Sequence, residues 1–291
     1  MTSTTTSQAS SLPGVNVCLM GPSGTGKTHS LGTLVETGVE VFYLGLEPGL
    51  ESLLGYFTDR GKPVPDNLHW HIVASPTASF SELISSAKDI NTLSLDLLAK
   101  RQDPNRSKHN RFVSVLEALN NFKCDRTGEE FGAVNSWDTS RCLAIDGQTG
   151  LNNAAMSLVV GGKAVRNMSD WGIAQDLIEK ILRMLTENCE CHFVLLAHVE
   201  RETDQVLGGI KISISTLGKA LGPKIPAMFS DVVLATRTGS KWTWDTASAM
   251  ADVKTRNLSI SSTLEPSFKT IMDKWLSRGG SLRPRSDSTS T

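Results

Sequence analysis

Residues 21–30 read GPSGTGKTHS, and this stretch gives the first indication of the fold. A glycine, four further residues and then Gly-Lys-Thr is the spacing of a phosphate-binding loop. Its glycines let backbone N–H groups turn inward around an anion. The lysine brings positive charge to the β- and γ-phosphates, and the threonine hydroxyl suits Mg²⁺. We therefore expect ATP and Mg²⁺ to bind here, although no motif excludes GTP, through Gly21, Pro22, Ser23, Gly24, Thr25, Gly26, Lys27, Thr28 and His29.

The sequence around the loop has the expected context of a buried strand before it and a helix after it. The apolar run VNVCLM (15–20) predicts the strand, and residues 27–36 predict a helix whose N-terminus points at the phosphates. Further strands are expected at 39–47, 69–75, 142–146 and 192–198, and helices at 79–90, 111–122 and 170–187. This alternation predicts an α/β fold, a mostly parallel sheet flanked by helices. Shorter strands at 206–215, 231–237, 241–247 and 250–256 predict an antiparallel extension at one edge.

Length and composition indicate one large domain of 14–276 with a polar tail at each end. The chain has 291 residues and a net charge of −1, so nucleic acid would have to bind through a local patch. Residues 1–13 and 277–291 are poor in apolar residues and are expected to be disordered. Residues 93–140 break the alternation and are read as an insertion without an assigned role. Five cysteines without a secretion signal or an apolar membrane span favour the cytoplasm.

Three polar residues end predicted strands and should therefore meet at the ligand edge of the sheet. Asp146 closes CLAID and is expected to hold Mg²⁺ through water; the alternative is a helix cap. Glu47 ends the strand after the loop helix and can polarise a water for attack on the γ-phosphate, unless it only shapes the turn LEPG. His198 ends HFVLLAH and can sense the γ-phosphate, or it is an ordinary hydrogen-bonded histidine.

The order of these motifs resembles a RecA-like core ATPase. GPSGTGKT, VFYLGLE, CLAID, VLLAH and the later LGKALGPKIPAMFSDVVLA and DVKTRNL are similar to phage-encoded RecA-like ATPases of single-strand annealing and recombination. The resemblance covers residues 15 to about 275 and implies DNA-coupled ATP hydrolysis in a homo-oligomeric ring or filament. A single-strand DNA-binding protein is then a candidate partner. By the same resemblance, Glu47 is the water-activating glutamate, Asp146 the metal-holding aspartate and His198 the sensor.

The resemblance also implies roles outside the strand ends, and the chain departs from the family pattern in two places. Residues 203–224 correspond to a mobile DNA-facing loop, while Lys254 and Arg256 correspond to cations that reach a neighbour's γ-phosphate. The alternative for both cations is an exposed strand charge. Gly147 stands where the family often has Ser or Thr, and residues 93–140 make the distance from Lys27 to Asp146 unusually long.

Two basic segments are candidates for contact with single-stranded DNA. Residues 100–111 carry five cations and could track a phosphate backbone or form a solvated loop; they include Arg106, Lys108 and Arg111. The Gly-rich segment 208–224 carries Lys211, Lys219 and Lys224 and could grip a strand or form a hairpin and connector. We prefer the second segment because it directly follows His198. A change in the bound nucleotide could therefore be passed from His198 to the segment that holds the DNA.

The sequence therefore favours an ATPase that acts on DNA in phage recombination or replication. A small-molecule phosphotransferase is one alternative, with residues 100–111 as a lid, but Glu47 suits water activation better. A nucleotide-gated DNA assembly or packaging accessory is another, because it would need the phosphate loop but not Glu47 as a base.

Overall fold

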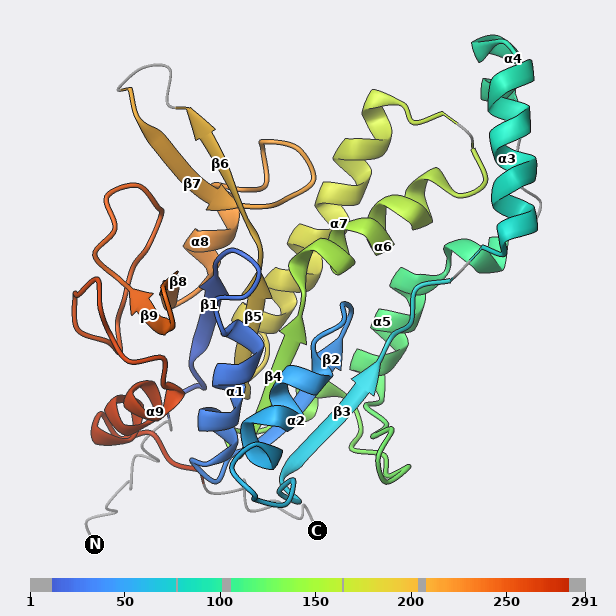
Figure 1. Cartoon of the computed structure of the whole chain (residues 1–291). Helices are drawn as coiled ribbons and strands as arrows, with labels where there is room; N and C mark the ends of the chain where they lie inside the picture. The colour runs from blue at the N-terminus through green and yellow to red at the C-terminus, as the bar shows by residue number, and fades with distance from the viewer. Residues whose placement is uncertain (1–11, 77, 101–105, 164, 204–207, 283–291) are drawn as a thin grey trace, which may run out of the picture.

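Apolar, β-branched stretches of the chain form one central sheet in the computed structural model (Figure 1). The structure describes residues 12–76, 78–100, 106–163, 165–203 and 208–282. Seven strands are arranged in the order β3-β2-β4-β5-β1-β8-β9. Their bounds are β1 (Asn16–Met20), β2 (Glu40–Gly45), β3 (Leu68–Ile72), β4 (Arg141–Asp146), β5 (His192–Ala197), β8 (Asp231–Thr238) and β9 (Lys241–Asp245).

The first six of these strands in the spatial order are parallel, so their carboxyl ends meet at one edge. Gly45 pairs with Asp146, Asp146 pairs with Leu196, and Met20 pairs with Ala197. The residues that follow β1, β2, β4 and β5 therefore emerge side by side. This edge is where a ligand binds in open parallel sheets.

Helices cover both faces of the sheet and enclose two apolar cores. One core lies under α1 (Lys27–Val35), α2 (Leu50–Thr58) and α9 (Phe268–Ser277). The other lies under α5 (Arg111–Asn120), α6 (Gln148–Val160), α7 (Met168–Glu187) and α8 (Lys224–Met228). Strand β1 alternates between them, with Leu19 in the first core and Cys18 and Met20 in the second. The predicted α/β architecture with a mostly parallel sheet is confirmed.

The antiparallel extension is present but differs from the prediction. Strand β9 pairs with β8 at the sheet edge, whereas β6 (Val199–Thr203) and β7 (Ile210–Ile214) form a separate two-stranded sheet. The strand predicted at 250–256 is wrong, because that segment makes only the isolated bridges Ile212–Ala251 and Val232–Lys254. The buried carboxylate of Asp231 accepts the N–H groups of Arg256 and Asn257 at 2.8 and 2.9 Å, which turns the chain away from a ladder.

Between β3 and β4 the chain forms α3 (Phe80–Thr92), which precedes the predicted insertion 93–140. The insertion contains α4 (Leu95–Lys100), α5 and two 3₁₀ turns, Arg106–His109 and Val134–Ser136. A capping box between Ser79 and Glu82 starts α3, so the predicted helix is confirmed. Its apolar face is not buried, however, and Phe80 is 85% exposed. In contrast, α5 buries Phe112 and Val115 in the second core. The region between β3 and β4 is thus partly an integral layer of the domain and partly a projecting arm (Figure 1).

Ordered contacts extend slightly into both predicted tails. The indole of Trp275 donates to the carbonyl of Pro13 at 2.9 Å. Thr139 donates to the carbonyl of Ser281 at 2.5 Å, and Leu282 packs against the first core, beyond the predicted start of the tail at 277. The rest of the predicted tails, 1–11 and 283–291, lies outside the described residues. Within the described part of the chain, no helix is both long enough and apolar enough to cross a membrane.

Candidate functional site

The phosphate loop joins β1 to α1 in a conformation that needs glycine. Gly24 and Gly26 have φ values of 76° and 77°, the left-handed region that residues with a side chain avoid. Gly26 is also the N-cap of α1, so the first N–H groups of the helix have no acceptor within it. The loop therefore offers several backbone donors and a helix N-terminus to one anion.

Lys27 lies within this loop and is only 7% exposed. Its ammonium donates to the carbonyls of Gly21 and Pro22 at 2.8 and 2.9 Å. Burial lowers the pKa of Lys27, whereas the nearby charges of Asp146 and Glu47 raise it. The lysine is thus held by neutral groups and is available to an incoming phosphate.

Asp146 lies beside the loop at the end of β4 and is 7% exposed. Its Oδ2 accepts hydrogen bonds from the hydroxyls of Thr28 at 2.7 Å and Tyr43 at 3.0 Å. Burial raises the pKa of Asp146, because its negative charge is costly away from water. A carboxylate and a hydroxyl are hard oxygen ligands, and a bound cation would offset the buried charge. These residues therefore fit Mg²⁺.

Glu47 follows β2, and its carboxylate is held at both oxygens. Oε1 accepts the N–H of Gly150 at 2.7 Å, and Oε2 lies 3.2 Å from Nε2 of His198. The hydrogen bond with His198 is the largest cause that lowers the pKa of Glu47, and the Gly150 N–H and Lys27 lower it further against the effect of burial. The carboxylate of Glu47 therefore favours its ionised form and is held in one orientation.

Gly147 stands at the position where the resemblance led us to expect Ser or Thr, and its contacts show what a larger residue would meet there. A Cβ at Gly147 would lie 2.8 Å from the carboxyl carbon of Glu47, so a side chain there would displace the carboxylate of Glu47 from its present position. The carboxylate occupies the space that a larger residue would need. The departure thus accompanies the placement of Glu47 next to Asp146, the residue before Gly147.

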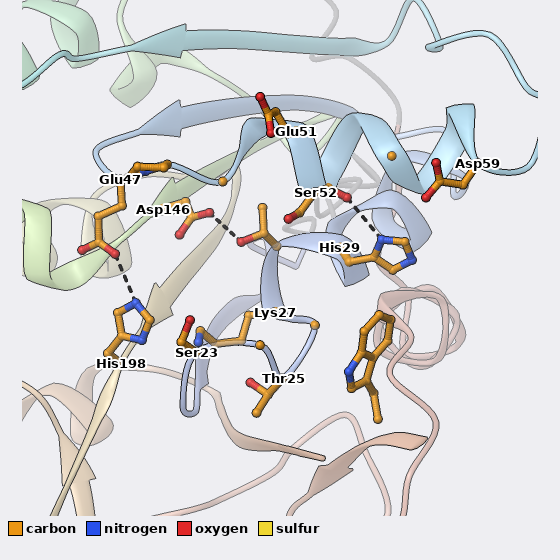
Figure 2. Close-up of a pocket in the computed structure, with 17 residues that line it drawn as sticks. Ser23, Thr25, Lys27, His29, Glu47, Glu51, Ser52, Asp59, Asp146 and His198 are labelled. Atoms are coloured by element: carbon orange, nitrogen blue, oxygen red, sulfur yellow. Dashed lines mark hydrogen bonds and ion pairs between the residues drawn. The ribbon is translucent and has the colours of Figure 1, made fainter. Parts of the chain in front are cut away.

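One cavity of about 490 Å³ brings together Ser23 to His29 of the predicted loop with Glu47, Asp146 and His198, whereas Gly21 and Pro22 do not line it (Figure 2). In Figure 2, Glu47, Asp146 and His198 lie on one side of Lys27, and His29 and Asp59 lie on the other. The volume of this cavity is typical of a site that binds a small molecule. The cavity is lined by Ser23, Gly24, Thr25, Gly26, Lys27, Thr28, His29, Glu47, Asp146 and His198, together with residues of α2 and Trp242.

Lys254 and Arg256 do not belong to this cavity. Lys254 pairs with Val232 near the start of β8, at the end of the strand away from the phosphate loop, and donates to the carbonyl of Ala227 at 3.3 Å. Burial lowers the pKa of Lys254, and the positive charge of Arg256 lowers it further. Both side chains are exposed. Their predicted action on a neighbouring subunit therefore stays a prediction.

The lysines predicted to contact DNA each have a carboxylate partner. Lys211 lies 3.6 Å from Asp252, Lys219 lies 3.7 Å from Glu202, and Lys224 lies 2.8 Å from Glu179. Lys108 pairs with Glu82 at 2.5 Å, and the backbone of Arg106 lies in a 3₁₀ turn. Exposed pairs of this kind contribute about 0–1 kcal/mol, so a phosphate could replace the carboxylate. DNA contact at these residues stays a prediction.

Arg111 has a different place from the one that the sequence suggested. Its guanidinium donates to the carbonyl of Val73, with Nε at 3.1 Å and Nη2 at 2.9 Å, and also to the carbonyl of Leu46. Leu46 immediately precedes Glu47, so Arg111 ties the insertion to the candidate base. Arg111 is thus not a solvated-loop cation, because α5 begins at this residue, as the predicted helix 111–122 does, and places its guanidinium at the ends of β2 and β3.

Tyr43 and Trp242 also belong to the site, and the sequence analysis did not identify them. Tyr43 lies four residues before Glu47 on β2, and a buried tyrosine hydroxyl usually finds a partner, which could have indicated its bond to Asp146. Trp242 comes from β9, more than 200 residues after the loop, and no local pattern connects the two.

No protein-family model and no curated protein matches the chain. Among solved structures, the RadB recombinase aligns with 80% of this chain and 81% of its own, at 12% sequence identity and a TM-score of 0.37. A likeness at this level carries no functional argument, so function has to be inferred from the geometry of the site itself.

Proposed function

We propose that the protein is a Mg²⁺-dependent ATPase that couples hydrolysis to single-stranded DNA binding in phage recombination or replication. The observation that carries the proposal is the carboxylate of Glu47, held by Gly150 and His198 at the mouth of a phosphate loop. A fixed carboxylate beside a triphosphate is suited to activating water.

In the proposed hydrolysis, some residues stabilise the charge on the phosphates, and others position the attacking water. Lys27 and the loop N–H groups bind the β- and γ-phosphates and offset the charge that develops on them. Thr28 and Asp146 would hold Mg²⁺, which when bound neutralises charge on the phosphate oxygens. Glu47 orients the attacking water and accepts its proton. His198 keeps the carboxylate in place through the bond at 3.2 Å.

A hydrogen-bonded path from this site supports coupling to DNA. The carbonyl of His198 accepts the N–H of Ser215 at 2.9 Å, and Asn152 donates to the carbonyl of Ser215 at 3.1 Å. Ser215 follows β7, and His198 precedes β6, so both ends of the β6–β7 hairpin are tied to the ligand edge. A change at Glu47 can therefore move the hairpin and its Lys211.

We further propose that the protein acts as a homo-oligomer, a ring or a filament, with a single-strand DNA-binding protein as a candidate partner. Lys254 and Arg256 support this, because both are exposed and neither lines the cavity of its own chain. An inserted cation stabilises charge on a transferring phosphoryl group.

The test is steady-state ATP hydrolysis in Mg²⁺, with and without single-stranded DNA, for wild type and Glu47→Gln. We expect stimulation by DNA in the wild type. Glu47→Gln should bind ATP normally and hydrolyse it at least about 100-fold more slowly, the usual contribution of a general base. Glu117→Gln on the exposed side of α5 is the matched control.

Other outcomes would point to a different function. Full turnover in Glu47→Gln would remove Glu47 from the mechanism. Binding without hydrolysis in the wild type would favour a nucleotide-gated assembly factor, and transfer of the phosphoryl group to an added small acceptor would favour a phosphotransferase.

A further inference from the structure

An exposed tryptophan lies against the phosphate loop. Trp242 on β9 is 37% exposed, although it is a large aromatic residue at the wall of a cavity. A methyl group added at Gly26 would lie 3.0 Å from Cδ2 of Trp242, so the indole rests on the loop itself. An apolar ring surface left open to water at a ligand pocket indicates that a ligand covers it.

His29 extends this aromatic surface along the first turn of α1. Its ring centroid lies 5.3 Å from that of Trp242 and 5.1 Å from that of Tyr56. Nδ1 of His29 lies 3.2 Å from the carbonyl of Ser52, which fixes the orientation of the ring. Trp242 and His29 therefore form a corner, which we call the aromatic corner, at one end of the cavity.

The two ends of the cavity differ in charge. One end contains Lys27 with the Thr28–Asp146 pair, where phosphates and a cation are favoured. At the other end, Asp59 lies on the same side of Lys27 as His29 of the aromatic corner (Figure 2). A triphosphate would be repelled there, whereas a neutral planar group would not. The phosphates and the rest of the ligand are thus assigned to opposite ends.

Gly55 keeps the second end open. It lies within α2, where glycine costs about 1 kcal/mol relative to alanine. A Cβ at this position would meet only the carboxylate of Asp59, at 3.5 Å, so a larger side chain would extend into the cavity rather than into the core.

We propose that the aromatic corner is the base-binding subsite of this nucleotide site, in which a purine base stacks on Trp242. The inference rests on the proposed phosphate site and adds the residues that recognise the base. Purines fit better than pyrimidines because they offer more ring area to the indole. Trp242 is thus a binding residue supplied by the antiparallel edge of the sheet.

Titration calorimetry of the full chain in Mg²⁺ tests this with two probes, ATP and inorganic tripolyphosphate. Tripolyphosphate has the phosphates but no base. Trp242→Ala should weaken ATP binding about 10-fold, within the range of base–aromatic stacking. The same variant should bind tripolyphosphate within about 2-fold of wild type, because phosphate contacts come from the loop. Lys241→Ala, the neighbouring exposed position on β9, is the control.

Two further variants distinguish a lost base subsite from a misfolded protein: one replaces Trp242 conservatively, and the other fills the pocket. Trp242→Phe should retain most of the ATP affinity but lose part of the ATP-induced change in tryptophan fluorescence. Gly55→Leu should weaken ATP and leave tripolyphosphate unchanged.

Three outcomes would overturn the subsite. They are equal losses for both probes in Trp242→Ala, unchanged ATP affinity in that variant, and UTP binding as tightly as ATP. If the wild type binds neither probe, the proposed function fails as well. If tripolyphosphate binds and Trp242→Ala has no selective effect, only the subsite fails.

Discussion

The edge of the sheet where the candidate site lies and the β6–β7 hairpin both carry charges with predicted functions, but they hold them differently. At the edge, Lys27 is bonded to carbonyls and Asp146 to hydroxyls, so neither charge is neutralised by a direct ion pair. At the hairpin, Lys211 on β7 and Lys219 just after it, here called the hairpin lysines, already face Asp252 and Glu202.

This difference indicates that the edge of the sheet is a specific ligand site, whereas the hairpin is a surface whose charged pairs a ligand could displace. Buried charges without a direct ion pair are costly, so their presence at the edge supports the proposed binding of ligands of opposite charge. The exposed pairs of the hairpin are weak and cost nothing comparable. We therefore expect mutations at the edge to have large effects and mutations at the hairpin to have small ones.

Lys27→Ala should have the largest effect. Removal of the ammonium leaves the loop carbonyls of Gly21 and Pro22 facing the phosphates, so ATP turnover should fall at least about 100-fold, as for other groups that stabilise developing charge. Turnover and ATP affinity are measured together. Lys180→Ala on the exposed face of α7 is the control. Activity near that of wild type in Lys27→Ala would show that mutations at the edge have effects no larger than those at the hairpin.

Asp146→Asn should lower Mg²⁺-dependent turnover less than Lys27→Ala does, and yet stabilise the nucleotide-free protein. Burial raises the pKa of Asp146 in the folded state, so the unfolded chain releases this proton at a lower pH. The stability contributed by the proton is present below the unfolded pKa of about 3.9 and is lost as pH rises through the folded value. A neutral amide avoids that cost at neutral pH.

Thermal unfolding without nucleotide checks this second prediction. A gain of about 1 kcal/mol would raise the Tm by about 2–4 °C. A Tm that falls in Asp146→Asn would show that the buried carboxylate stabilises the fold, and the edge would then resemble an ordinary structural network.

Arg111→Lys should have an intermediate effect on catalysis. Lysine keeps the charge but not the planar group that reaches the carbonyls of Val73 and Leu46 together. Glu47 would lose part of its alignment, so kcat should fall about 10-fold, because small misplacements are costly. KM for ATP should stay nearly constant. A change in KM alone would indicate a role in binding and not in positioning.

Lys219→Ala should have the smallest effect. Its side chain is 88% exposed, and its partner Glu202 is 3.7 Å away. Loss of one phosphate contact should weaken single-stranded DNA binding a few-fold and lower the salt dependence by about one unit of slope. Fluorescence anisotropy at several salt concentrations measures both quantities. An unchanged salt slope for Lys219→Ala and Lys211→Ala would remove the hairpin lysines from the DNA proposal.

The sequence by itself determined the strand–loop–helix unit and the residues at the strand ends. The spacing of Gly21, Lys27 and Thr28 is local, and parallel strands bring their carboxyl ends to one edge whatever connects them. Glu47, Asp146 and His198 could therefore be placed near the loop before the structure was known. The parallel strands and the helices α1, α3, α5 and α7 followed from periodicity, and the antiparallel edge followed from it only in part. The helices α2, α6 and α9 were not predicted, although they cover the sheet.

Only the tertiary structure decided which distant residues complete the site. Trp242 reaches Gly26 because β9 pairs with β8, and Arg111 reaches Leu46 because α5 packs across the ends of two strands. Glu202 pairs with Lys219, and Asp231 accepts the N–H of Arg256 and turns the segment 250–256 away from a strand. Such contacts join positions far apart in the chain, so no periodicity or motif encodes them. The physical reason is that local sequence sets backbone preference, whereas packing decides which side chains meet.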